Sequence, residues 1–285
     1  MIKRILIAIL VIIIVTCTSF IYIYFIPNQT ISKIKFQDDS LEISENFDNF
    51  KIIAFSDLKI KNESDLIELN NLVNLINDQE PNLVIFLGDV FAETSNINDN
   101  LIEQIKDSLS SIQAKSGKFA VLGEVDLLAI EKIYPLLFDS EFEILEDKSL
   151  KIFNGSNDYI NLIGMSISSS GNYNTQTAFT NVNKTAYTIT LCHYPNLFSK
   201  IEGKTNLFLA GHTLGGERVL PFIGPNKAIE GTDQYYNGIV TDNNATMIIS
   251  NGIGENEDYR ILAEKNIIVV TLKHKDKNST INTQE

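Results

Sequence analysis

The sequence predicts an α/β (or α+β) protein in which one globular body follows an N-terminal membrane-spanning helix. Three observations predict this: apolar strand-like runs alternate with amphipathic helical segments, the second half is richer in strands, and residues 5–26 form an uncharged apolar run. The length of 285 residues and the 44% hydrophobic content suit one domain of ordinary size with an extra piece at one end. We find no internal repeat, and nothing divides the body into two domains.

The apolar run is long enough to cross a bilayer. Ile5–Ile26 reads ILIAILVIIIVTCTSFIYIYFI, and a helix rising about 1.5 Å per residue would span the roughly 30 Å hydrocarbon core. A secretory signal peptide has a shorter apolar region and a small-residue cleavage site, and no A-x-A pattern follows here. We therefore predict an uncleaved anchor over residues 1–27.

Basic residues on both sides of the anchor bear on its orientation. Lys3 and Arg4 precede it and favour a cytoplasmic N-terminus. The body is then predicted on the extracytoplasmic side of the cell membrane. Lys33 and Lys35 lie just beyond the anchor and oppose this orientation.

The first half of the body alternates between strands and helices. Residues 28–49 are expected to hold a linker and the first strands. The helical segment Asn62–Asp78 can be capped at its start by Asn62 or Ser64. Its apolar face is formed by Leu66, Leu69, Leu72, Val73 and Ile76. A second amphipathic helix is marked by Leu101, Ile105, Leu109 and Ile112. The predicted strands are Ile31–Phe36, Lys51–Phe55, Leu83–Leu87 and Lys118–Leu122.

The second half reads mainly as strands. Two hairpins are predicted: Phe142–Phe153, with a turn near Asp147, and Gly238–Ser250. The polar tail 274–285 is predicted to be disordered. The remaining predicted strands are Tyr159–Ile163, Tyr187–Cys192, Asn206–Ala210 and Ile267–Lys273.

Charge and cysteine usage exclude two classes of protein. The formal net charge is −13, and no basic stripe is present to neutralise phosphates, so we expect no nucleic-acid partner. The only cysteines are Cys17 in the apolar run and Cys192 in the body. This pair cannot form a framework of disulfides.

Metal-ligating residues follow five of the predicted buried strands. Because the carboxyl ends of neighbouring strands meet at one edge of a sheet, these side chains can converge on one point. Carboxylate oxygens and imidazole nitrogens are ligands of divalent transition metals. A single Gly-Asp after a strand is usually only a turn, but the repeated placement predicts a metal site. The residues are Asp57, Asp89, Glu124 with Asp126, His193 and His212.

The residues and the order of these motifs resemble those of the calcineurin-like metallophosphoesterases, in particular of their small bacterial membrane-associated branch. That family reads D-x-H, G-D, G-N-H-D or G-N-H-E, a lone His before Pro, and G-H-T-H-G-G. The resemblance covers roughly residues 50–273 and implies a four-layer αββα sandwich, a phosphoesterase domain with its site at the strand ends. The matching segments here are SDLK at 56–59, GDV at 88–90, GEVD at 123–126, CHYP at 192–195 and GHTLGGE at 211–217.

The resemblance also shows where this chain departs from the family. The family binds two metals. Its first metal would take Asp57, Asp89 and two histidines, but those histidines are Lys59 and Leu214 here. Its second metal would take Asp89, an Asn that is Glu124 here, His193 and His212. The family's catalytic histidine is Val125, so the resemblance assigns no catalytic residue.

Formal charges leave two states of the site open. Asp57, Asp89 and Glu124 give −3 and Lys59 gives +1, so one divalent metal brings the sum to zero. Two protonated histidines without a metal do the same. The cofactor is therefore predicted to be one divalent metal (Mn, Fe or Zn) at the second site, or none. Lys59 is expected to replace the charge of the lost first metal.

These departures lead to two hypotheses about function. The first is a membrane-anchored family member that is catalytically impaired or inactive, a pseudoenzyme with a binding role. The alternative is a weak single-metal phosphoester hydrolase acting on a lipid-linked or cell-envelope phosphate ester. The expected partners are the membrane, through the N-terminal helix, and either a phosphate-ester ligand or a protein.

Overall fold

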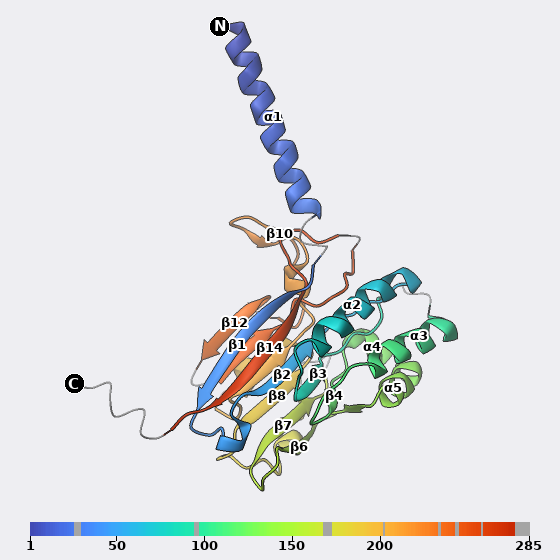
Figure 1. Ribbon diagram of the computed structural model, residues 1–285, viewed down its shortest axis with the longest axis vertical. Coiled ribbons are helices and arrows are strands. Elements are labelled where there is room, and N and C mark those ends of the chain that lie inside the picture. Colours follow the sequence, from blue (N-terminus) through green and yellow to red (C-terminus); the bar gives the residue numbers. More distant parts are fainter. Residues whose placement is uncertain are drawn as a thin grey trace, which may run out of the picture.

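Two six-stranded sheets stacked face to face form the body in the computed structural model (Figure 1). The structure describes residues 1–25, 30–93, 97–167, 173–201, 203–232, 235–242, 245–257 and 259–276. The predicted polar tail therefore lies, from residue 277 onward, outside the described residues, as does the last residue of the predicted apolar run.

The first sheet has the strand order β1-β14-β2-β3-β4-β5. Strands β2 to β5 are parallel, whereas β14 is antiparallel to β2 and parallel to β1. Because of this, β1 begins at the edge of the sheet where β2 ends. The bounds are β1 (Ser32–Ser40), β2 (Phe50–Phe55), β3 (Leu83–Phe86), β4 (Lys118–Ala120), β5 (Phe142–Ile144) and β14 (Asn266–His274).

The second sheet has the order β12-β13-β9-β8-β7-β6. Its four central strands are parallel, and β12 and β6 pair antiparallel at the two sides. The predicted hairpin over Gly238–Ser250 is confirmed by the β12–β13 pairing. The bounds are β6 (Lys148–Phe153), β7 (Tyr159–Met165), β8 (Thr188–Cys192), β9 (Leu207–Ala210), β12 (Gly238–Asp242) and β13 (Ala245–Ile249).

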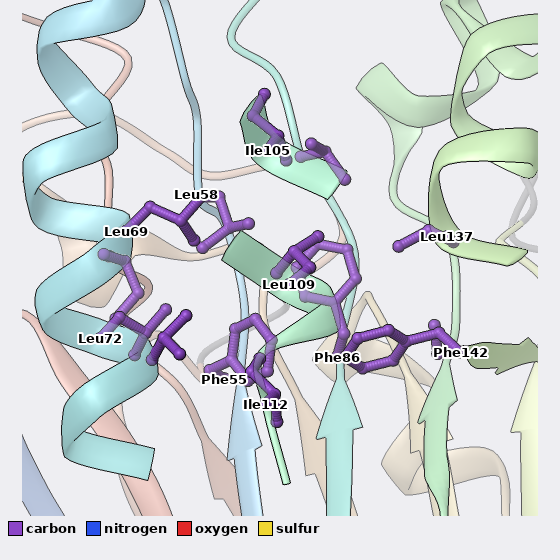
Figure 2. Close-up of a cluster of buried hydrophobic side chains, with 14 of the residues drawn as sticks. Phe55, Leu58, Leu69, Leu72, Phe86, Ile105, Leu109, Ile112, Leu137 and Phe142 are labelled. Carbon is purple, nitrogen blue, oxygen red and sulfur yellow. The ribbon is translucent and has the colours of Figure 1, made fainter. Parts of the chain in front are cut away.

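Helices α2 (Leu66–Asn77), α3 (Asp99–Ser110) and α5 (Ile130–Asp139) cover the outer face of the first sheet. Figure 2 shows their leucines and isoleucines meeting Phe55, Phe86 and Phe142 of the sheet. The predicted apolar face of α2 is confirmed, since all five of its apolar residues at helical spacing are buried. Helix α5 carries Pro135 in its interior and does not follow from the sequence pattern.

The layers of the body are those of the predicted αββα sandwich. An apolar core fills the space between the sheets, with Ile52 and Ile85 from the first and Leu162 and Leu209 from the second. The outer face of the second sheet is covered by shorter elements, so this fourth layer is thin. They are the single-turn helix α6 (Thr175–Ala178) and the 3₁₀ segment η3 (Pro195–Lys200).

The segment Phe142–Phe153 is not the hairpin that the sequence predicts. Its first half, β5, pairs with β4 in the first sheet, and its second half, β6, pairs with β7 in the second. The polar residues around Asp147 therefore mark a crossing between the sheets. The prediction was wrong because a turn signal between two strand-like runs does not reveal which strands they pair with.

Helix α1 (Ile2–Phe25) lies outside the sandwich (Figure 1). Among the described residues, it is the one helix that is long and apolar enough to cross a membrane, over Ile2–Phe20. A signal sequence near an N-terminus would have the same properties.

Candidate metal centre

The structure brings the predicted ligands together at the end of the sandwich where β2, β3, β4, β8 and β9 finish. Two overlapping groups form there, each with ligand atoms within 4.8 Å of one another. One contains Asp57, Asp89 and His193, and the other contains Glu124, His193 and His212. His193 belongs to both groups and is fully buried.

The loops that carry the site hold a strained backbone. Five site residues adopt positive φ, a conformation that is unfavourable for residues with a Cβ by roughly 1–2 kcal/mol each. Hydrogen bonds between the loops hold them there: Asp57 N–H donates to the Gly88 carbonyl at 2.8 Å, and His212 N–H donates to Asp57 Oδ2 at 2.9 Å. Such strain concentrates at functional sites. The five residues are Asp57 (φ 50°), Lys59 (45°), Asp89 (65°), His212 (72°) and Leu214 (50°).

His193 presents Nε2 to the site. Its Nδ1 lies 2.6 Å from the Leu87 carbonyl oxygen, which can only accept, so Nδ1 carries the hydrogen. Nε2 faces Glu124 Oε2 at 3.0 Å and Asp89 Oδ2 at 3.4 Å. Despite the short distances, neither Nε2 nor Glu124 Oε2 has a partner in hydrogen-bond geometry.

His212 is oriented in the same way. Its Nε2 lies 2.7 Å from the Glu230 carbonyl oxygen, so this nitrogen carries the hydrogen. Its Nδ1 is left facing Glu124 Oε1 at 3.1 Å and also has no partner in hydrogen-bond geometry. The ring of Tyr194 packs against that of His212, with centroids 4.3 Å apart. Both imidazoles therefore aim a nitrogen at the Glu124 carboxylate.

This arrangement fits a divalent cation. Buried polar atoms normally find hydrogen bonds, yet Glu124 Oε2, His193 Nε2 and His212 Nδ1 converge without forming any. Each histidine uses its other nitrogen on a carbonyl, which is the usual outer support of a metal-ligating imidazole. Glu124, His193 and His212 thus form a donor set of nitrogen and oxygen that suits Mn, Fe or Zn, and Asp89 Oδ2 adjoins it, 3.4 Å from His193 Nε2.

The carboxylates also govern the protonation of His193. Burial alone would lower the pKa of His193, but Asp89 and Glu124 raise it well above its usual value. Burial alone would likewise raise the pKa of Glu124, but His193 and His212 hold it far below its usual range. The two carboxylates thus favour a positive charge at His193 against the cost of its burial.

Lys59 occupies the other half of the site. Its side chain is buried, and Nζ donates a hydrogen bond to Asp89 Oδ2. Burial would lower the pKa of Lys59, but Asp89, Asp57 and Glu124 together raise it. Leu214 is buried too and approaches Gly252 beside Asp57. A fixed ammonium and an apolar side chain thus lie where the family resemblance places two metal-binding histidines.

The residues after β4 support the site but offer no exchangeable proton at position 125. The Val125 side chain is buried, and its backbone N–H donates to Asp89 Oδ1 at 3.0 Å. Asp126 accepts from the N–H groups of Asp89 at 2.7 Å, Val90 at 2.9 Å and Gly123 at 2.9 Å. Burial and the neighbouring Asp89 raise the pKa of Asp126 to about 6, although these backbone hydrogen bonds lower it. Asp126 acts as a brace for the Asp89 loop.

Sequence reasoning missed Arg260, whose side chain is completely buried behind the site. Its guanidinium donates to the carbonyls of Leu214 at 3.2 Å, Asn251 at 2.6 Å and Gly254. It thereby ties the loop after β9 to the loop after β13. The residue stands in a polar stretch without any motif, so only the carbonyls around it in the structure reveal its role.

We expect Arg260→Met to lower the free energy of unfolding by about 3 kcal/mol, because three carbonyls, one of them in a fully buried hydrogen bond, lose a charged donor. Urea denaturation of the full chain in detergent measures this loss. Lys148→Met is the matched control, since it breaks an exposed ion pair with Glu143 and should change stability by less than about 1 kcal/mol. Equal stability of the two variants would contradict the bracing role.

A cavity of about 390 Å³ opens over the Glu124–His212 half of the site. Its walls come from Tyr194, from residues 256–257, and from the chain on both sides of the hairpin formed by β10 (Val219–Leu220) and β11 (Gly224–Pro225). The two basic residues in these walls, Arg218 and Lys227, both pair with Glu257, at 3.2 and 2.8 Å. A ligand can therefore approach the candidate metal position directly from this cavity.

Comparisons with known proteins show similarity to metallophosphoesterases. No family model matches the chain. The metallophosphoesterase YkuE of Bacillus subtilis (strain 168) is 27% identical over 239 residues, which cover 81% of this chain and 82% of that protein. A metallophosphoesterase of Aquifex aeolicus (strain VF5) is 25% identical over 244 residues, 79% of this chain and 88% of that protein. A dimetal phosphatase from Danio rerio superposes with a TM-score of 0.42 at 11% identity, covering 72% of this chain and 88% of that one.

Proposed function

Because the chain belongs to the calcineurin-like metallophosphoesterase family, we propose that it is a membrane-anchored phosphate-ester-binding protein with one divalent metal and impaired hydrolysis. The observation that carries this proposal is the pair of buried imidazole nitrogens that converge with Glu124 on one point, while Lys59 fills the other half of the site. The α1 helix serves as the anchor, and the body lies on the extracytoplasmic side of the membrane.

Each part of the site has a role in binding. Asp89, Glu124, His193 and His212 hold the metal, which when bound supplies a Lewis acid for a phosphoryl oxygen. Lys59 supplies a fixed positive charge beside it, and its hydrogen bond to Asp89 orients that carboxylate. The cavity of about 390 Å³ gives room for the rest of the ester.

The impairment of hydrolysis follows from position 125. The Val125 side chain cannot donate a proton to a leaving oxygen, and loss of a general acid typically slows a reaction by about 10²–10⁴-fold.

The second candidate function is slow hydrolysis, and one observation favours it. Asp57 Oδ1 is buried beside Lys59 without a hydrogen-bond partner and could accept the proton of an attacking water.

Metal content tests the proposal directly. The full chain, purified in detergent without chelators and incubated with Mn²⁺ or Zn²⁺, should hold about one metal per chain by mass spectrometry. His212→Ala should lose most of it, because one of two nitrogen ligands is gone. His274→Ala is the matched control: His274 closes β14 far from the site, with Nδ1 on the Ile43 carbonyl, and its removal should leave the metal content unchanged.

The outcomes separate the hypotheses. A metal-free native chain, or equal metal content in both variants, would refute the single-metal site. Hydrolysis of bis-p-nitrophenyl phosphate by the loaded chain then separates the two functions. Turnover that is lost with His212→Ala indicates a slow hydrolase, whereas metal binding without turnover indicates a binding protein.

A further inference from the structure

The hairpin β10–β11 exposes an unusual run of apolar side chains. Strands β10 (Val219–Leu220) and β11 (Gly224–Pro225) pair antiparallel, and the tip between them reads Pro221-Phe222-Ile223. Phe222 is fully exposed, and Ile223 is 78% exposed. Single exposed apolar residues are common on soluble proteins, but a consecutive run at a hairpin tip indicates a surface that contacts something else.

The chain topology places this hairpin beside the exit of the anchor. Glu217 and Val219 at the hairpin base exchange backbone hydrogen bonds with Ile261, each at 2.9 Å. Four residues later, the Lys265 carbonyl accepts a hydrogen bond from the N–H of Ser32, the first residue of β1, at 2.8 Å. Figure 1 shows the hairpin at the end of the sandwich from which α1 departs.

The length of the connection fixes how far this edge can lie from a bilayer. Six residues, and therefore seven Cα-to-Cα steps, lie between Phe25, the end of α1, and Ser32. Fully extended, they reach about 25 Å at most. Because β1 starts at the edge where β2 ends, the edge that carries the metal centre lies within this reach of the end of α1.

We propose that the tip of the β10–β11 hairpin inserts into the lipid bilayer that holds α1. This inference rests on the anchoring in the proposed function. An aromatic and two aliphatic side chains, Phe222 with Leu220 and Ile223, match the acyl boundary beneath the headgroups. The exposed Lys33, at the start of β1, lies at the same edge of the sheet. Its positive charge suits the phosphates of the lipid headgroups.

Insertion of the tip determines where the cavity opens. Residues 216–218 enter the hairpin and residues 226–227 leave it, and both stretches line the cavity over the metal centre. With the tip among the acyl chains, these two stems stand at the level of the headgroups. The cavity then receives a phosphate ester from the membrane surface.

Tryptophan fluorescence tests this contact, because the native chain contains no tryptophan. The full chain carrying Phe222→Trp is reconstituted into phosphatidylcholine vesicles with and without lipids brominated on the acyl chains. Phe138→Trp is the matched control: Phe138 is 76% exposed and lies at the C-terminal end of α5, next to the start of β5, at the opposite end of the sandwich. The Phe222→Trp emission should shift to the blue and lose most of its intensity to bromine, whereas the Phe138→Trp emission should not.

Two further measurements make the result decisive. Adding Ile223→Asp to Phe222→Trp should abolish the quenching, because a carboxylate opposes insertion. Flotation of the vesicles reports anchoring separately. A chain that does not float refutes the anchoring, whereas a chain that floats with equal quenching at both positions refutes the hairpin contact alone.

Discussion

The double variant Lys59→His, Leu214→His is expected to bind about two divalent metals per chain, compared with about one in the native chain. Removing Lys59 frees Asp89 Oδ2, and Asp57 Oδ1 is already without a hydrogen-bond partner. Two imidazoles added to these two carboxylates complete a second donor set of nitrogen and oxygen. Mass spectrometry of the purified full chain measures the stoichiometry.

The backbone favours this exchange. Lys59 and Leu214 both have positive φ, at 45° and 50°. Histidine is several-fold enriched over most residues in this left-handed region. The two substitutions therefore place the new side chains without adding strain.

The single variant Leu214→His is the control for the double variant. It keeps the Lys59 ammonium on Asp89 and should still bind about one metal. A double variant that remains at one metal per chain would show that Lys59 does not stand in for a metal.

Adding Val125→His to the double variant should raise phosphodiester hydrolysis by about 10²–10⁴-fold, since it supplies the missing general acid.

Local periodicity made the main elements predictable from the sequence. The buried face of α2 follows from spacings of three and four residues, and all five predicted side chains are buried. The destination of Lys148–Phe153 could not be obtained in this way. It depends on whether the segment pairs with Phe142–Ile144, its neighbour in sequence, or with β7, and that choice is made by the packing of the two sheets.

For the site, the sequence indicated the candidate ligands but not the groups that orient them. The rule that ligands gather at strand ends identified Asp57, Asp89, Glu124, His193 and His212. It could not identify what orients them. The carbonyls that fix the two imidazoles belong to Leu87, 106 residues from His193, and to Glu230, 18 residues from His212. Such partners are backbone carbonyls, which every residue type has. The sequence therefore does not indicate which carbonyls orient the imidazoles.

Replacing Lys59 by methionine should lower the free energy of unfolding of the metal-free chain by about 3–5 kcal/mol. Lys59 Nζ is buried and bonded to Asp89 Oδ2, and its removal leaves that charge without compensation in a site that already holds Asp57 and Glu124. Methionine keeps nearly the same length and apolar stem as lysine. The loss of stability therefore measures the removal of the positive charge. Urea denaturation of the full chain in detergent measures it.

Added Mn²⁺ should restore much of this stability, because a divalent cation bound only by the folded chain compensates the same carboxylates. Lys265→Met is the matched control. Lys265 is an equally buried lysine, but its partner Glu68, at 2.7 Å, lies outside the metal centre. Its loss of stability should not respond to Mn²⁺. If both variants respond alike, or if Lys59→Met is as stable as the native chain, Lys59 is not the cation that neutralises this site. The contrast between the two lysines therefore isolates electrostatic replacement of a metal from the general cost of breaking a buried ion pair.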